Sequence, residues 1–535
     1  MPDDLPSIYV EDLGSDTCPM STAPHQQVRL ADLLAAISLA TDLGTGQPIE
    51  HGLRTCHIAM GLARSIGLPV QDLFDTYYVS LLRFLGCTSE ASADAALNGG
   101  DELALYKGVA PSLMGSSSEV IGWMVRNLAE GRPPLTRARL LGLALTDPKG
   151  AERSFRAHCE VGRMLARRIG LSDSVLHALG FAYERWDGKG LPNGIAGEEI
   201  PVSCRVAIVA RDYELLNRMR EPDTATKFLR ERKGRAYEPR VLEAALEHGP
   251  RLIAQVEEGS LWDAVLEAEP GPQRTVDDAH VDDVLTAFAQ FVDLKSPYLH
   301  GHSTGVAELA EQAARASEMD PTMLRRAALV HDLGRVAVPS GIWNKEGPLS
   351  EGEWEQVRLH SYFTDRILTR CGPLRDLAEV ASSHHERMDG SGYHRGTKAP
   401  SLSSEARLLA AADAFRAMTE RRPHREALSS SRAAAELERT CAEGRLDVQS
   451  VRAVLQAAGE PLKAAQSAWP AGLTDREVEV LRLLASGLSN KAIANALTLS
   501  PKTVGHHVEH IYAKIQVSTR PGATLFAIEQ GLVGV

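Results

Sequence analysis

The segment His331-Asp332-Leu333-Gly334-Arg335 places an imidazole, a carboxylate and a guanidinium within five residues. A His-Asp pair is expected about once by chance in a chain of this composition, so the pair alone predicts little. The neighbouring sequence strengthens the prediction of a metal site, because residue types that bind metals occur in order on both sides of the pair. The full series is His302, His331, Asp332, His360, His384, His385 and Asp413.

These five imidazoles and two carboxylates predict a dinuclear metal site. Neutral imidazoles bind divalent cations individually, and a carboxylate such as Asp332 can bridge two of them. Two divalent ions of iron or manganese suit this set, whereas a structural zinc favours thiolates and a closed shell of four ligands. A hydroxide held by such a pair can attack phosphorus. We therefore predict a metal-dependent phosphohydrolase site with Asp332 as a catalytic residue.

Each residue taken singly has an ordinary alternative. A lone histidine such as His302 or His360 is more often a surface residue or a satisfied core residue than a ligand. The ordered set and the turn Asp389-Gly390-Ser391-Gly392-Tyr393 favour the site, because glycine lets the backbone approach a substrate closely.

The first half of the chain repeats this series in a reduced form. His158 lies 26 residues before Glu184, and His360 lies 26 residues before Glu386. At the ligand positions the first copy has His51, Arg83, Phe84, His158, Ala182, Tyr183 and then Arg211 or Asp212. Most of the ligands are lost, so no dinuclear site is expected there. The copy also has additional residues, from about Ser89 to Gly150.

The second copy, from about Asp293 to Asp447, resembles the HD-GYP branch of the HD phosphohydrolase superfamily, whose members are helical bundles that hydrolyse cyclic di-GMP. The resemblance implies that the seven residues are metal ligands and that Arg335 replaces a phosphate-contacting lysine, as a catalytic and substrate-binding residue. It also implies that Arg422 and Arg425 hold the substrate phosphates, which suits a guanidinium fork. The alternative is a pair of solvated arginines at a helix end.

The chain departs from that family pattern at three positions. The Gly-Tyr-Pro signature reads Gly392-Tyr393-His394, and Tyr298 stands where some members have a further metal-binding glutamate. A third metal is therefore not expected. Arg335 keeps the charge of the usual lysine but changes its reach, which leaves the substrate open.

A helix-turn-helix is predicted from Leu473 to the end. Thr474-Asp475-Arg476-Glu477 is a capping box that begins a helix, and Gly487 ends it. A second helix follows Ser489, and Ser500-Pro501 supplies an N-cap and a first-turn proline for a third helix over 501–515. A fourth helix begins near Arg520. In such a module the third helix lies in the major groove of double-stranded DNA.

Residues 473–533 resemble the LuxR-type DNA-binding domain, in Ser489-Asn490-Lys491 and Ser500-Pro501-Lys502-Thr503-Val504 among other segments. The resemblance and the docking geometry imply contacts to bases or phosphates. The candidate residues are Asn490, Lys491, Lys502, Thr503, His506, His507, Lys514 and Arg520. The net charge of −12 argues against a protein that coats nucleic acid over its whole surface, but it allows one DNA-binding module.

Composition and breaks in the pattern predict a mostly α protein with two helical HD-like bundles in tandem and a four-helix C-terminal domain. We expect a flexible tail at 1–28, a degenerate HD-like domain at 29–265 that is sensory, dimerising or merely supporting, an HD-GYP-like domain at 277–458, a linker at 459–472 and the DNA-binding domain at 473–535. Seven scattered cysteines fit a reducing compartment. No apolar run reaches the roughly 18 residues that span a bilayer, so we expect a cytoplasmic protein without a membrane segment.

Two functions remain open. One is a homodimeric transcription regulator in which a cyclic dinucleotide or another phosphorylated ligand controls DNA binding. The other is a cyclic dinucleotide phosphodiesterase tethered to DNA. The complete ligand set favours a competent enzyme, and the alternatives are a catalytically inactive ligand sensor and a phosphohydrolase that acts on another nucleotide.

Overall fold

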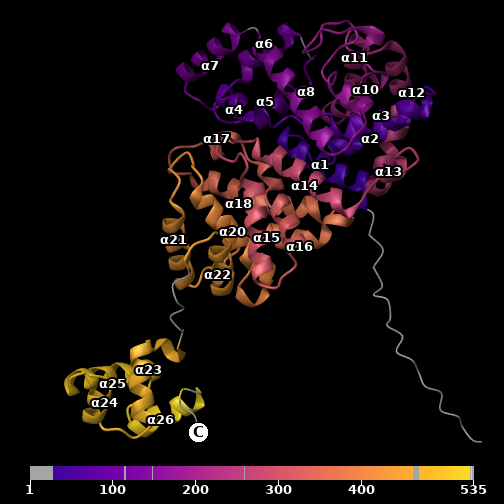
Figure 1. Ribbon diagram of the computed structural model, residues 1–535. Helices are drawn as coiled ribbons and strands as arrows, with labels where there is room; N and C mark the ends of the chain where they lie inside the picture. The colour runs from indigo at the N-terminus through magenta and orange to yellow at the C-terminus, as the bar shows by residue number, and fades with distance from the viewer. Residues whose placement is uncertain are drawn as a thin grey trace, which may run out of the picture. The chain divides into compact units, whose positions relative to one another are not determined.

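The computed structural model describes residues 28–113, 116–147, 149–257, 259–461, 469–530 and 532. The chain divides into two compact units, one up to Ala457 and one from Ala458 onward. Helices form nearly all of the regular structure in the described residues, which confirms the mostly α prediction (Figure 1). The predicted tail, except for Val28, and the linker residues 462–468 lie outside the described residues. The other predicted domain boundaries stay predictions.

The first copy and its additional segment form a succession of helices. They are α1 (Leu30–Gly44), α2 (His51–Ser65), α3 (Val70–Leu82), α4 (Ala91–Leu97), α5 (Glu102–Val109), α6 (Ser117–Asn127), α7 (Pro134–Thr146), α8 (Gly150–Arg168), α9 (Asp173–Leu179), η1 (Gly197–Glu199), α10 (Val202–Met219), α11 (Pro222–Glu231), α12 (Pro239–Glu257) and α13 (Leu261–Ala268). The residues without a counterpart in the second copy thus form α4 to α7.

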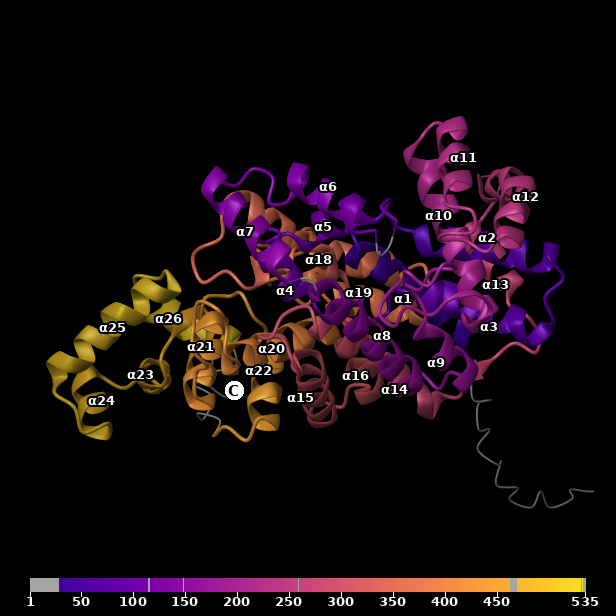
Figure 2. The same cartoon turned by 90° about the horizontal axis from the view of Figure 1, so that it is seen from above.

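The second copy continues in the same manner. Its helices are α14 (Asp278–Asp293), α15 (His302–Ala316), α16 (Pro321–Val330), η2 (Leu333–Ala337), α17 (Ser340–Trp343), α18 (Glu351–Leu368), η3 (Gly372–Leu374), α19 (Arg375–Ser382), η4 (Ala399–Ser401), α20 (Ser404–Thr419), α21 (Ser430–Ala442) and α22 (Val448–Ala457). Figures 1 and 2 show both copies as bundles of packed helices.

The two copies share local structure as well as sequence spacing. α2 and α15 both begin at a histidine that follows a residue with positive φ, Glu50 at 79° and Gly301 at 75°. α10 begins 18 residues after Glu184, and α20 begins 18 residues after Glu386. This register sets Arg211, rather than Asp212, opposite Asp413.

The segment between the copies is anchored to the chain's first described residues. β1 (Val28–Arg29) and β2 (Thr275–Val276) pair antiparallel. The buried carboxylate of Glu269 accepts hydrogen bonds from Arg29 Nε at 2.8 Å and Tyr78 OH at 2.7 Å. The segment between the copies is therefore a folded connection, because the Glu269 carboxylate is bound by Arg29 and Tyr78.

The copies also pack against each other inside the first unit. α1 lies against η2 and α18, and α4 lies against α17 (Figure 1). Gly341 N donates to Gly100 O at 3.1 Å, and Asn344 Nδ2 donates to Ser92 Oγ at 2.8 Å. Residues 92–102 of the first copy thus contact the stretch that follows Arg335.

The second unit contains η5 (Pro470–Gly472) and four helices, α23 (Asp475–Ala485), α24 (Asn490–Ala496), α25 (Pro501–Ile515) and α26 (Arg520–Glu529). Thr474 and Glu477 make both hydrogen bonds of the predicted capping box. Val504, Ile511 and Ile515 of α25 are buried in the core of this unit. In the described residues of the whole chain, no helix is long and apolar enough to cross a membrane.

Candidate metal centre and DNA-binding module

Five helices bring the seven predicted metal ligands together. His302 begins α15, His331 and Asp332 directly follow α16, and His360 lies in α18. The His384-His385 pair follows α19, and Asp413 lies in α20. All are buried except His385, which is half-buried. Buried ionisable groups need partners, so their convergence in one place favours a common ligand.

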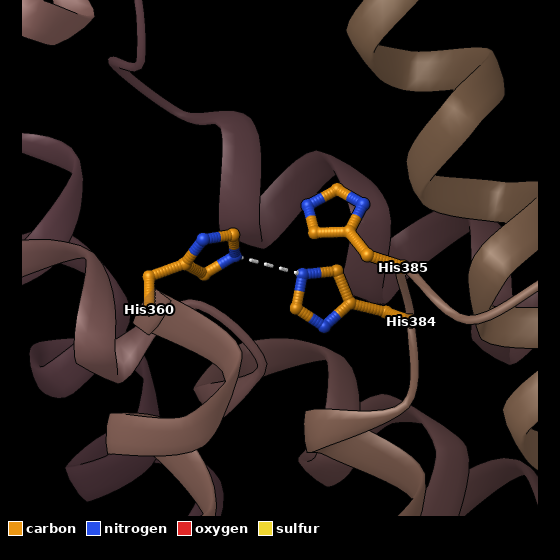
Figure 3. A group of neighbouring side chains, drawn as sticks. All are labelled: His360, His384 and His385. Carbon is orange, nitrogen blue, oxygen red and sulfur yellow. Dashed lines mark hydrogen bonds between the residues drawn. The ribbon is translucent and has the colours of Figure 1, made fainter. Parts of the chain in front are cut away.

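Their coordinating atoms form two neighbouring groups, and a third group of His331, Asp332 and His384 joins them. In one group, atoms of His302, His331 and Asp413 all lie within 4.8 Å of one another. In the other, atoms of His360, His384 and His385 do the same, and Figure 3 shows these three rings facing a common space. Such spacing is what a bound cation with several ligands requires.

Asp332 connects the two groups through its two carboxylate oxygens. Oδ2 lies 3.1 Å from His331 Nε2 and 3.7 Å from His302 Nε2. Oδ1 lies 3.4 Å from the Nε2 atoms of both His360 and His384. Each oxygen thus faces a different histidine group, which is the placement of a bridging carboxylate.

Hydrogen bonds on the far side of the rings orient the imidazoles. Nδ1 of His331 and Nδ1 of His384 each lie 2.6 Å from the carbonyl oxygen three residues earlier. Nδ1 of His360 contacts the Val357 carbonyl in the same way. Since Nδ1 donates these bonds, Nε2 carries a lone pair toward the centre.

His302 is oriented by a carboxylate instead. Its Nδ1 lies 2.8 Å from Glu420 Oε2, and its Nε2 lies 3.2 Å from Asp413 Oδ1. Sequence reasoning missed Glu420. The repeat gives no signal for it, because His51 in the first copy contacts Glu214 through the same ring nitrogen, but the register sets Glu214 opposite Arg416 rather than Glu420.

The charges of the site suit a cation. Burial by itself raises the pKa of Asp332, but Arg335 and His331 hold it well below its ordinary value. Burial lowers the pKa of His384 to about 4, so this ring is neutral at neutral pH. The pKa of His302 is about 9 despite burial, because Asp413 and Glu420 accept hydrogen bonds from it. A cation at Nε2 of His302 would take the place of that proton.

Arg335 lies beside Asp332 in the buried site. Its Nη1 is 2.7 Å from Asp332 Oδ2, without the alignment of a hydrogen bond. Its guanidinium lies 4.9 Å from the centre of the Trp343 ring. The side chain is thus held between a carboxylate and an aromatic face, and its contact with a substrate phosphate stays a prediction.

The two other predicted phosphate contacts have different surroundings. Arg422 Nη2 donates to Glu420 Oε2 at 2.9 Å and lies 3.4 Å from His302 Nδ1, so it adjoins the centre. Arg425 donates to the carbonyls of Met418 at 2.7 Å and Ala417 at 2.8 Å. Arg425 therefore caps the C-terminal end of α20, and its substrate role stays a prediction.

The glycine-rich turn has a structural reason for its glycines. A Cβ at Gly392 would lie 2.5 Å from the Glu386 Cα, and Gly390 has a φ of 82°. In the first copy, a Cβ at Gly190 would also lie 2.5 Å from the Glu184 Cα. The close approach is thus to the chain's own backbone. Tyr393, from the same turn, packs its ring 4.3 Å from the ring of His385.

The predicted DNA contacts fall into two classes. Lys491, Lys502, Thr503 and His506 are exposed, and His507 is half-buried. Lys502, Thr503, His506 and His507 lie on α25, so the third helix presents polar groups to its surroundings.

The remaining predicted contacts make hydrogen bonds or ion pairs within the module. Lys514 Nζ lies 2.7 Å from Glu477 Oε2, and Arg520 Nη2 donates to Asn490 Oδ1 at 3.0 Å. These bonds link the capping box to α25 and the start of α24 to α26. Contacts of Lys514, Asn490 and Arg520 with DNA stay predictions.

Two family models match this chain. The model described as "HD domain" matches residues 149–241 and 286–449, which fall in the two copies. The model described as "Bacterial regulatory proteins, luxR family" matches residues 471–527. Both resemblances inferred from the sequence are confirmed.

Relatives cover both copies. A 3'3'-cGAMP-specific phosphodiesterase 3 of Vibrio cholerae is 32% identical over 419 residues, which are 76% of this chain and 90% of the relative. A cyclic di-GMP phosphodiesterase of Pseudomonas aeruginosa, PA4108, is 34% identical over 35% of this chain and 49% of its own length.

A crystal structure of a cyclic GMP-AMP specific phosphodiesterase of V. cholerae has a TM-score of 0.57 and 28% identity to this chain. It covers 82% of this chain and 99% of the other. The shared identity over most of both chains shows common descent. The chain therefore belongs to the HD-domain family of metal-dependent phosphohydrolases, and it carries a C-terminal module of the luxR regulatory family.

Proposed function

We propose that this protein is a metal-dependent cyclic dinucleotide phosphodiesterase joined to a DNA-binding regulatory module. The observation that supports the catalytic part most strongly is Asp332, whose two oxygens face two separate histidine groups. The proposed site residues are the seven predicted ligands, with Arg335 and Arg422 as phosphate contacts. Iron or manganese is the proposed metal, in two copies, because imidazole and carboxylate donors suit both.

Each part of the site has a separate task in this proposal. The bound metals would supply an activated water and neutralise charge on the phosphate. His331, His360 and His384 present fixed Nε2 atoms, and Glu420 orients His302. Arg335 and Arg422 stabilise negative charge that develops on the phosphate oxygens, since a guanidinium retains its charge at all relevant pH values.

The substrate proposed first is 3'3'-cGAMP. The relative named for that substrate aligns with most of this chain, whereas the cyclic di-GMP phosphodiesterase of P. aeruginosa aligns with about a third of it. Both substrates contain the same kind of phosphodiester bond. The test is a comparison of turnover on 3'3'-cGAMP, cyclic di-GMP and linear dinucleotides, and absence of turnover on all of them would favour the sensor alternative.

Removal of the metals is expected to abolish turnover. Dialysis against a chelator should lower the rate at least about a hundredfold, because the water then keeps its ordinary, high pKa. Addition of Mn²⁺ or Fe²⁺ should restore activity, and metal analysis should give two ions per chain. Full activity in metal-free protein would contradict the catalytic proposal.

The DNA-binding role can be tested separately through Lys502. This exposed residue lies in the first turn of α25. We expect Lys502→Ala to weaken binding to duplex DNA by about tenfold at low salt, since a lost phosphate contact costs about 1 to 2 kcal/mol and reduces the salt dependence. Lys227→Ala, an exposed lysine on α11, is the matched control and should bind DNA like the parent protein. Equal loss in both variants would argue against a specific role of α25.

The proposal extends to a cytoplasmic homodimer on double-stranded DNA. Helix-turn-helix proteins commonly bind two half-sites as dimers. Footprinting together with sedimentation of the protein and DNA measures both the number of half-sites and the number of chains bound.

A further inference from the structure

In the first copy, arginines stand where the second copy has cation ligands. Arg83 follows α3 as His331 follows α16, and Arg211 occupies the place of Asp413. The Arg83 residue is 9% exposed, and the Arg211 side chain is 12% exposed. The ligand positions of a cation site have thus acquired two buried positive charges.

The guanidinium of Arg83 has unused donors. Its Nε and Nη1 atoms are buried, and neither makes a hydrogen bond to a described residue. The group lies 5.5 Å from the centre of the Phe84 ring and 5.6 Å from that of Tyr183. Aromatic faces attract a cation, but they have no acceptor atoms for the paired N–H donors of a guanidinium. A buried guanidinium in this state is unfavourable unless an anion reaches it.

The carboxylate that interacts electrostatically with Arg83, Asp212, is already engaged. Asp212 Oδ1 lies 2.6 Å from Arg211 Nη1, and Asp212 Oδ2 accepts from Tyr237 OH at 2.8 Å. One carboxylate therefore faces two guanidiniums, and the cluster keeps a net positive charge. His158 adds two buried ring nitrogens without a hydrogen bond, and its ring lies 6.1 Å from that of Tyr183.

We propose that this cluster is a binding site for a phosphoryl group, with Arg83 as its main contact and Arg211 and His158 beside it. The fork of N–H donors on a guanidinium matches two phosphate oxygens. Free phosphate and the phosphate of a nucleotide share this chemistry. The site needs neither metal binding nor turnover in the second copy, so it can be tested independently of the proposed function.

The test uses the full chain after chelator treatment, so that no metal-bound phosphate contributes. Inorganic phosphate should raise the melting temperature, and calorimetry should detect its binding, whereas chloride at equal ionic strength should do neither. A titration with 3'3'-cGAMP on the same protein distinguishes a nucleotide phosphate from free phosphate.

Arg83→Met should abolish the response to phosphate and should leave the phosphate-free protein as stable as the parent or more stable, because it removes a buried charge. Arg83→Lys should fold and bind phosphate about tenfold more weakly, since it loses the fork. Arg167→Met, the same change at an exposed arginine of α8, should keep the response. Undiminished phosphate binding by Arg83→Met, or a lower melting temperature of that variant without phosphate, would overturn the proposal.

Discussion

Replacement of Asp332 with asparagine is expected to reduce phosphodiester hydrolysis at least about a thousandfold, equivalent to about 4 kcal/mol of activation free energy. The change keeps the shape of the side chain but removes its charge. Because one oxygen faces His331 and the other faces His360 and His384, the loss would affect both proposed metal positions at once. Turnover and metal content should therefore fall together.

Two comparisons make this result interpretable. Asp376→Asn makes the same chemical change at an exposed carboxylate of α19, and it should leave both readouts unchanged. Circular dichroism should show the same helix content in both variants. Retention of two metals and of activity in Asp332→Asn would show that Asp332 is not the bridging ligand.

Glu102→Gln is expected to cost about 3 to 5 kcal/mol of folding free energy, the typical loss when one partner of a buried ion pair is removed. Glu102 of α5 and Lys295 are both fully buried and form an ion pair between the two copies. Glu102 also accepts hydrogen bonds from Ser340 N and Ser340 Oγ at 2.9 Å. Lys295 Nζ donates in turn to Val336 O at 2.9 Å, one residue after Arg335.

The measurement is the midpoint of urea unfolding of the full chain, with helix content as the probe. Turnover is assayed at urea concentrations below the unfolding transition. Glu160→Gln, at an exposed position of α8, is the control and should have the parent midpoint. The double change Glu102→Leu with Lys295→Met should recover part of the loss, since an apolar pair replaces the unpaired charge. An unchanged midpoint in Glu102→Gln would mean that this contact adds nothing to the joining of the copies.

The sequence allowed the local features of this fold to be predicted. The capping box at Thr474 and the start of the third helix at Pro501 depend on neighbouring residues, so the pattern was sufficient. The seven ligand candidates were found because they form an ordered series, and the resemblance to the HD-GYP branch implied their role. The structure brings all of them into one buried centre.

Contacts between distant residues were beyond reach of such reasoning. The Glu102–Lys295 pair joins positions 193 residues apart, and neither residue has a local signal. Basic residues posed a related problem, because the sequence does not show whether a lysine or arginine binds a phosphate or the carbonyls at a helix end. The donors of Lys514 and Arg425 bond Glu477 and the Met418 carbonyl of α20, and their predicted contacts with DNA and substrate stay predictions.

The orientation of the imidazoles has a consequence for metal supply. His331, His360 and His384 are each fixed by a carbonyl of their own preceding helical turn, so the ring positions depend on the local backbone rather than on the ion. A centre built this way should exchange its metals without refolding. Iron and manganese should then compete on availability, and the activity of the protein should follow the metal status of the cell that makes it.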